Sequence, residues 1–170
     1  MDILACVGTN WEIGKDDKLI YHIKKDMDFF KEMTLRNAVV MGRKTLESLP
    51  NGKPLKDRLN IVLSSKANEL NKHLESDNLI YIDNIKDIYR VAKNLLIFCI
   101  GGESVYRELL PYCQNAYITY VFDRQLGDTF FPNLEFNDDW KVKYSSVVEF
   151  EEDIPFSFRI YENQNVKNLS

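Results

Sequence analysis

Short apolar runs alternate with amphipathic segments over the first two thirds of the chain. The runs that predict strands lie at residues 2–7, 38–41, 60–63, 79–82 and 95–100. The segments that predict helices lie between them, at residues 23–34, 45–49, 68–74, 85–92 and 104–110. Such alternation is typical of parallel strands joined by helical crossovers, and near-continuous apolar strands are typical of sheets covered on both faces.

The last third of the chain has a different pattern. Residues 116–122, 140–150 and 156–161 predict strands with no helix between them, and residues 141–147 alternate as a half-exposed antiparallel strand does. We therefore expect an α/β fold with a mixed, mostly parallel sheet of about eight strands, an antiparallel C-terminal edge hairpin and helices on both faces.

Length and composition limit the possible classes of protein. A chain of 170 residues and 20.0 kDa is long enough for one hydrophobic core, and 45% apolar with 28% charged residues is ordinary globular composition. We expect a single domain at residues 1–162 and a polar, frayed tail at residues 163–170. The net charge of −4 and the pI of about 5.3 give no basic footprint for nucleic acid.

The expected surroundings of the protein follow from features that the sequence lacks. No apolar run approaches the ~18 residues of a membrane span, and no basic segment precedes the first apolar stretch as in a signal peptide. Three cysteines, an odd and small number, favour unpaired thiols in a reducing compartment, and no Cys/His cluster has zinc-site spacing. The pattern shows no large unexplained apolar surface. We expect a cytoplasmic monomer without membrane, nucleic-acid or metal partners.

Asp26 is the one charge inside the apolar stripe of the predicted helix at residues 23–34. On a wheel of 100° per residue centred on Phe30, Asp26 lies about 40° from the centre, and the other charges lie beyond about 95°. A carboxylate in that stripe is costly unless it is paired or protonated. Two interpretations stay open. Asp26 is either a first-turn residue stabilised by the helix dipole or Lys25, or a buried acid with a raised pKa that faces a ligand.

Three strand-to-helix junctions carry groups that suit phosphate oxygens. At one of them, Gly101 and Gly102 let the backbone approach a ligand where a helix begins. The other two offer cations and hydroxyls from Gly42, Arg43, Lys44 and Thr45, and from Ser64, Ser65 and Lys66. Each alone is also typical of a plain turn or a capped helix start. Together they predict one groove for an extended anion such as a dinucleotide, beside the long connection at residues 8–22.

Further motifs extend nearly from end to end of the chain. They are Ile13-Gly14-Lys15, Asp26 with Phe29-Phe30-Lys31, residues 41–48, 58–65 and 100–106, Tyr117-Ile118-Thr119, and residues 127–132. In this order and at these separations they resemble the bacterial dihydrofolate reductases. The resemblance implies an NADPH-dependent enzyme that transfers a hydride to the pterin of 7,8-dihydrofolate while N5 takes a proton. Its product, tetrahydrofolate, supplies one-carbon metabolism.

The resemblance also implies roles for the matching residues. Asp26 would hold the pterin amino group and ring N–H and favour protonation of N5 through water, with Thr119 as its hydrogen-bond partner. Arg58 would pair bidentately with the glutamate α-carboxylate of the substrate. Tyr21 differs from the usual residue at its position, but its hydroxyl could keep the hydrogen bond to active-site water. The apolar walls around the substrate rings would be Leu4, Ala5, Cys6, Met27, Phe30, Leu49, Leu55 and Ile100. For the first three of these, ordinary core packing is the alternative.

The residues that would hold NADPH follow from the same resemblance. Cations and hydroxyls, rather than an acidic ribose-binding residue, favour NADPH over NADH. The matching positions are Cys6, Ile13, Gly14, Lys15, Gly42, Arg43, Lys44, Thr45, Leu63, Ser64, Ser65, Ile100, Gly101, Gly102, Glu103, Ser104, Val105 and Tyr106.

Two positions depart from the family pattern. Ile20-Tyr21 stands where Pro-Trp is usual, so the closure kinetics of this loop do not carry over. Glu103 stands where a small residue is usual, and its carboxylate would repel a pyrophosphate unless it points to solvent.

Two other functions remain open. One is a riboflavin-pathway-type reductase on the same scaffold, against which the combination of Asp26, Phe30, Arg58 and Thr119 argues. The other is a non-catalytic NADPH-binding module, against which the intact Asp26 argues.

Overall fold

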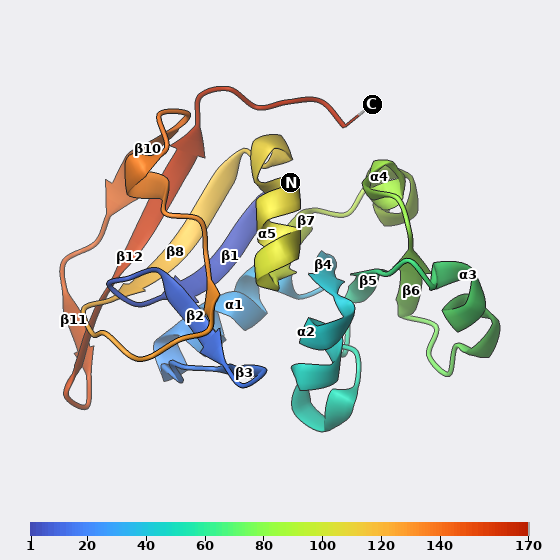
Figure 1. The fold of residues 1–170 in the computed structure, drawn as a ribbon, viewed down its shortest axis with the longest axis horizontal. Helices are drawn as coiled ribbons and strands as arrows, with labels where there is room; N and C mark the ends of the chain where they lie inside the picture. Colours follow the sequence, from blue (N-terminus) through green and yellow to red (C-terminus); the bar gives the residue numbers. More distant parts are fainter. Residues whose placement is uncertain (170) are drawn as a thin grey trace.

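The computed structural model describes residues 1–169 and contains two sheets (Figure 1). Within these residues the larger sheet has nine strands, in the order β10-β12-β8-β1-β7-β4-β5-β6, with β11 paired to β12. Its strands are β1 (Asp2–Val7), β4 (Ala38–Gly42), β5 (Leu59–Leu63), β6 (Leu79–Ile82), β7 (Ile97–Gly101), β8 (Asn115–Val121), β10 (Trp140–Ser145), β11 (Glu149–Glu151) and β12 (Ile154–Asn163). Pairs from β8 to β6 along this order are parallel, and β12 pairs antiparallel with its three neighbours. The predicted mixed sheet with an antiparallel edge is confirmed.

The helices lie between the parallel strands, as the alternation predicts. They are α1 (Lys24–Thr34), α2 (Arg43–Ser48), α3 (Ala67–Leu70), α4 (Ile88–Ala92) and α5 (Glu103–Leu109). The predicted helix at residues 68–74 divides into α3 and a 3-10 turn at Asn71–His73, and the one at residues 85–92 divides into a 3-10 turn at Ile85–Asp87 and α4.

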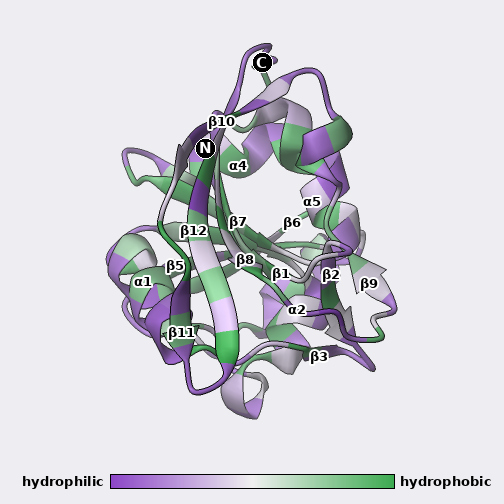
Figure 2. Cartoon of the chain, turned by 90° about the vertical axis from the view of Figure 1, so that its left-hand side faces the viewer, coloured by the Kyte–Doolittle hydropathy of each residue, from purple (hydrophilic) through white to green (hydrophobic). Residues whose placement is uncertain are grey.

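Both faces of the sheet are covered because successive side chains of a strand point to opposite faces. On β4, Val40 packs in a cluster with Leu109 of α5, whereas the adjacent Met41 packs with Leu46 of α2. Figure 2 shows the consequence, with α1 and α5 on opposite sides of the sheet. The near-continuous apolar strands of the sequence are therefore strands buried on both faces.

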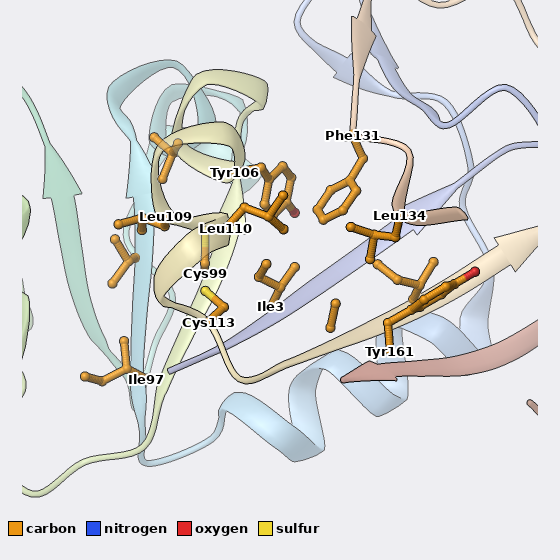
Figure 3. Packing of buried hydrophobic residues seen from close by; sticks show 14 of the residues in the cluster. Ile3, Ile97, Cys99, Tyr106, Leu109, Leu110, Cys113, Phe131, Leu134 and Tyr161 are labelled. Atoms are coloured by element: carbon orange, nitrogen blue, oxygen red, sulfur yellow. The ribbon is translucent and has the colours of Figure 1, made fainter. Parts of the chain in front are cut away.

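The largest core cluster lies between the sheet and α5 (Figure 3). Tyr106 of α5 meets Phe131 edge-on, with 4.7 Å between the ring centroids. Cys99 and Cys113 are fully buried in the same cluster, and both are unpaired thiols. They serve as small core hydrophobes, as expected from their sequence setting.

The long connection at residues 8–22 is more ordered than the sequence predicts. It contains β2 (Glu12–Lys15) and β3 (Lys18–Leu19), which form a three-stranded sheet with β9 (Thr129–Phe130). β3 pairs with one edge of β2, but the strand on its other edge, β9, lies more than a hundred residues away in the chain, where a local pattern carries no information about it. The predicted strand at residues 140–150 is likewise interrupted, because the chain leaves β10 after Ser145 and begins β11 at Glu149.

The described end of the chain, residues 163–169, makes hydrogen bonds to the body of the protein, whereas the sequence predicted a frayed tail; Ser170 lies outside the described residues. The side-chain amide of Asn163 donates to the carbonyl of Cys113 at 2.9 Å, and the backbone N–H of Lys167 donates to the carbonyl of Pro111 at 2.8 Å. Leu169 is 6% exposed, because its apolar side chain is packed against the protein. Among the helices of residues 1–169, each is too short or too polar to cross a membrane.

Candidate active site

Asp26 and Thr119 meet where α1 crosses the carboxyl-terminal half of β8. The Thr119 hydroxyl donates a hydrogen bond of 2.6 Å to Oδ1 of Asp26, and Thr119 itself is 2% exposed. Cys6 on β1 is the register partner of Thr119 in the sheet. Three elements from different parts of the chain therefore bring a carboxyl, a hydroxyl and a thiol to one point.

The surroundings of Asp26 disfavour its charged form. Burial raises the pKa of the Asp26 carboxyl, and the negative charge of Glu151 raises it further, while the hydrogen bond from Thr119 opposes the shift. Burial and the nearby Asp26 also raise the pKa of the Cys6 thiol well above its ordinary value. Of the two interpretations of Asp26, the structure favours the acid with a raised pKa, although the side chain is half-buried rather than fully buried.

A cleft of about 870 Å³ opens beside this point. Cys6 and Ile100 lie on its wall, and the three strand-to-helix junctions of the sequence analysis all border it. Among the residues predicted to hold a dinucleotide, Lys15 is the exception, since it is exposed on β2 and does not line the cleft. Lining residues that the prediction lacked are Asp17, Lys18, Leu19, Ser48, Asp83, Ile85, Arg107, Glu108 and Thr129.

In the glycine pair at the end of β7, Gly101 has a backbone conformation that residues with a side chain rarely adopt. Gly101 has φ +111°, and a Cβ added there would lie 3.0 Å from the Tyr106 ring. Tyr106 is held in turn by the hydrogen bond of 2.7 Å from its hydroxyl to the carbonyl of Leu4. The turn therefore places the Gly101-Gly102 backbone along the cleft with no side chain in the way.

Some of the residues predicted to form the apolar wall around the substrate rings pack together in the structure, and others do not. Leu49, Leu55 and Ile100 pack in one cluster around Met41 and Leu46. On α1, Phe30 is half-buried beside Asp26 in the apolar stripe, whereas Met27 is 48% exposed. Leu4 is 5% exposed and packs in the interior, and Ala5 is half-buried. The structure thus supports the alternative of core packing for Leu4.

Arg58 is placed by a loop that two asparagines hold. The side-chain amides of Asn60 and Asn78 donate to the carbonyls of Leu55 and Arg58 at 2.9 to 3.1 Å. The guanidinium of Arg58 donates to Thr34 Oγ1 at 3.3 Å, which brings it to the end of α1. Burial lowers the pKa of Arg58, although Asp57 opposes that shift. Asn60 is a polar residue next to an apolar run in the sequence, and in the structure it is fully buried. This position in the sequence could have identified Asn60 as a structural residue.

Comparison with known proteins decides the family. A family model for dihydrofolate reductase matches residues 1–163. The chain is 34% identical to the dihydrofolate reductase of Schistosoma mansoni, over 95% of both chains. It is 31% identical to that of Bacillus subtilis (strain 168), over 97% of this chain and 95% of the relative, and 35% identical to that of Staphylococcus aureus, over 93% and 94%.

The chain belongs to the dihydrofolate reductase family. The resemblance carried by the sequence motifs is therefore confirmed, and the chain is an oxidoreductase of that family.

The two departures from the dihydrofolate reductase pattern have partners in the structure. Glu103 does not stand alone in the cleft: its Oε1 accepts from Arg107 at 3.0 Å and its Oε2 accepts from the backbone N–H of Phe130 at 2.9 Å. Pairing with the Arg107 guanidinium offsets the repulsion expected between Glu103 and an anion. The second bond ties the glycine turn to the small sheet through β9.

Tyr21 is directed at a buried carboxylate that the sequence did not reveal. Its hydroxyl donates to Glu12 Oε1 at 2.9 Å and also lies 3.1 Å from the carbonyl of Asp123. Glu12 is fully buried and accepts two more hydrogen bonds, from the backbone N–H groups of Asn10 and Gln125 at 2.9 Å each. A glutamate in a polar connection is ordinarily solvated, so nothing in the local sequence marks Glu12 as buried.

Within residues 1–169 no cluster of three His, Cys, Asp or Glu residues could hold a metal ion.

Proposed function

We propose that this protein reduces 7,8-dihydrofolate to 5,6,7,8-tetrahydrofolate with NADPH. The observation that carries the proposal is the Asp26–Thr119 pair, which lies beside the cleft of about 870 Å³. A carboxyl with a raised pKa and a fixed orientation can bind the amino group and N–H of a pterin and keep a proton available near N5. In this scheme the proton reaches N5 through water, because Asp26 holds the ring edge rather than the reacting atom.

The donor set of the cleft fits a phosphorylated dinucleotide. Arg43 and Lys44 supply cations, and Thr45, Ser64 and Ser65 supply hydroxyls, all on the wall of the same cleft. The Gly101-Gly102 turn would let a pyrophosphate approach the backbone. NADPH would supply the hydride. Cys6 and Ile100, which line the cleft, would shield the nicotinamide and the pterin from water.

Arg58 would complete the substrate site by pairing with the α-carboxylate of the glutamate group. Its hydrogen bond to Thr34 places a cation beside the C-terminal end of α1, the helix that carries Asp26 in its first turn. Phe30, Leu49 and Leu55 would contact the rings between these two polar ends. Tyr21, whose hydroxyl is engaged by Glu12, would act on active-site water only through that pair.

The deciding experiment is a spectrophotometric assay of NADPH oxidation with dihydrofolate, with NADH as the comparison. We expect turnover with NADPH and much weaker turnover with NADH. If NADPH binds but is never consumed, the protein is a non-catalytic binding module. If a riboflavin-pathway pyrimidine replaces dihydrofolate as the better substrate, the related reductase is the correct function.

We further propose that the protein is a cytoplasmic monomer. The unpaired thiols of Cys6, Cys99 and Cys113 support a reducing compartment. Light scattering on the purified protein tests the monomer.

A further inference from the structure

Helix α1 begins without a cap from its own neighbourhood. The N-cap residue, Ile23, has an apolar side chain that makes no capping hydrogen bond. The first N–H groups of a helix have no partner inside it, so they must find acceptors elsewhere. This matters for the active site because Asp26 lies in this first turn.

The missing cap comes from the other end of the chain. Glu151, on β11, accepts a hydrogen bond of 2.7 Å from the backbone N–H of Lys24 with Oε2 and one of 3.2 Å from the N–H of Lys25 with Oε1. Figures 1 and 2 both show β11 beside the start of α1. A carboxylate is the group that a helix N-terminus stabilises best, because the helix dipole is positive there.

The hairpin that carries Glu151 is itself fixed. Glu149 at the start of β11 pairs with the side chain of Lys25 at 2.6 Å. The two strands of the hairpin are in register, with Glu149 opposite Phe156 and Glu151 opposite Ile154. The backbone of Glu151 is therefore held in place by the pairing of β11 with β12, in addition to the hydrogen bonds of its side chain.

We propose that Glu151 is a positioning residue of the active site, which caps the first turn of α1 and places a second carboxylate near Asp26. The inference rests on the proposed function only in treating Asp26 as the group that handles the proton. Neither residue is close to the other in sequence, and β11 contributes no side chain to the cleft described above.

The charge of Glu151 acts on Asp26 in a defined direction. After burial, Glu151 is the second cause that raises the pKa of Asp26, because a negative neighbour disfavours ionisation. On α1 itself, the charge of Lys24 is paired with Asp28 at 2.6 Å and that of Lys25 with Glu149. The hydrogen bond and the charge of Asp28 are the main causes of the raised pKa of Lys24, and the charge of Glu151 adds to them.

The groups that face Asp26 from the other elements are neutral. Thr119 on β8 donates its hydrogen bond, and burial raises the pKa values of Cys6 on β1 and Tyr106 on α5 well above their ordinary range. Both groups are therefore protonated at neutral pH. Glu151 is the carboxylate whose removal is expected to change the ionisation of Asp26.

The test compares three variants in the full chain. Glu151→Gln removes the charge but keeps one acceptor oxygen for the helix terminus. Glu151→Asp keeps the charge with a shorter reach. Glu149→Gln is the matched control, since it removes a negative charge from the same hairpin without touching the cap. The first measurement is the titration of the Asp26 carboxyl by ¹³C NMR, assigned by its loss in Asp26→Asn.

We expect the Asp26 midpoint to move to lower pH in Glu151→Gln, and to move less in Glu151→Asp and in Glu149→Gln. The hydride-transfer rate with NADPH and dihydrofolate should depend on protonated Asp26. At a fixed pH above the Asp26 midpoint, each pH unit by which the midpoint falls should lower that rate about tenfold. An unchanged midpoint in a folded Glu151→Gln, or an equal displacement in Glu151→Asp, overturns the proposal. If the midpoint moves but the unmodified protein reduces no dihydrofolate, the positioning role stands and the proposed function fails.

Discussion

The hydroxyl of Thr119 donates a hydrogen bond of 2.6 Å to the carboxylate of Asp26, 93 residues away in the chain. Hydrogen bonds between a hydroxyl and a charged carboxylate are short and about twice as strong as neutral ones. The bond therefore fixes the side chain of Asp26 on α1 relative to the sheet. It also favours the ionised form, against the burial that disfavours it.

Asp26→Asn should reduce turnover at neutral pH by about 10² to 10⁴-fold, because an amide cannot hold or release the proton. Its Oδ1 still accepts from Thr119, so the local structure should persist. NADPH affinity should barely change, since no phosphate contact is lost. The measurement is steady-state turnover from about pH 5 to about pH 9, which brackets the ordinary and raised ranges of a carboxyl. Equal turnover of both proteins over that range would remove Asp26 from the mechanism, and Asp28→Asn, exposed on the same helix, is the control.

Asp26→Asn should also make the protein more stable at neutral and alkaline pH. A carboxyl whose pKa is higher in the folded state contributes stability below its unfolded pKa of about 4, and this contribution is lost as pH rises through the folded pKa. The ionised Asp26 is thus a cost that the amide avoids. Thermal unfolding of both proteins should show a gap in melting temperature at pH 8 that narrows as pH falls toward about 4. A gap that is constant with pH would contradict this sign.

Thr119→Val should move the alkaline limb of the activity profile to higher pH. The valine has the same shape but no hydroxyl, so the interaction that lowers the pKa of Asp26 is gone. Loss of a hydrogen bond to a charged group should also lower the free energy of unfolding by about 1 to 3 kcal/mol. Thr119→Ser keeps the donor and is the control. A profile displaced to lower pH would show that the bond does not act on Asp26 as described.

Arg58→Leu should weaken dihydrofolate binding by about 10- to 100-fold, since a charge-assisted hydrogen bond contributes about 1.5 to 3 kcal/mol. NADPH affinity should stay the same. Equilibrium titration with each ligand separates the two effects, and Arg90→Leu, which removes an exposed arginine from α4, controls for the loss of a positive charge. Unchanged dihydrofolate affinity in Arg58→Leu would contradict the proposed pairing of Arg58 with the α-carboxylate of the substrate.

The parallel strands were predictable because each is a short run of apolar residues with helices on either side. All five appear within two residues of their predicted bounds, from β1 (Asp2–Val7) to β7 (Ile97–Gly101). Asp26 was also visible, since helical periodicity alone places it in an apolar stripe. Such features depend on residues that are neighbours in sequence, and the local backbone geometry follows from them.

The small sheet was not predictable in the same way. β2 and β3 are short and contain charged residues. β3 pairs with β2, and β2 pairs along its other edge with the distant β9. A segment of this kind has no pattern of its own that distinguishes a strand from a loop. The burial of Glu12 was unpredictable for the same reason, because its carboxylate is satisfied by Tyr21 and by the backbone N–H of Gln125, which lie elsewhere in the chain.

By itself the sequence determined the layered α/β fold, the position of Asp26 on its helix and the set of cations, hydroxyls and glycines at the strand ends. The tertiary structure decided which groups bind each polar or charged side chain. Thr119 donates to Asp26, Arg107 and the N–H of Phe130 donate to Glu103, and Glu151 accepts from the first N–H groups of α1. The physical reason is that apolar periodicity is a local property of the chain, whereas a buried charge is satisfied by whichever donor or acceptor the folded backbone brings within about 3 Å.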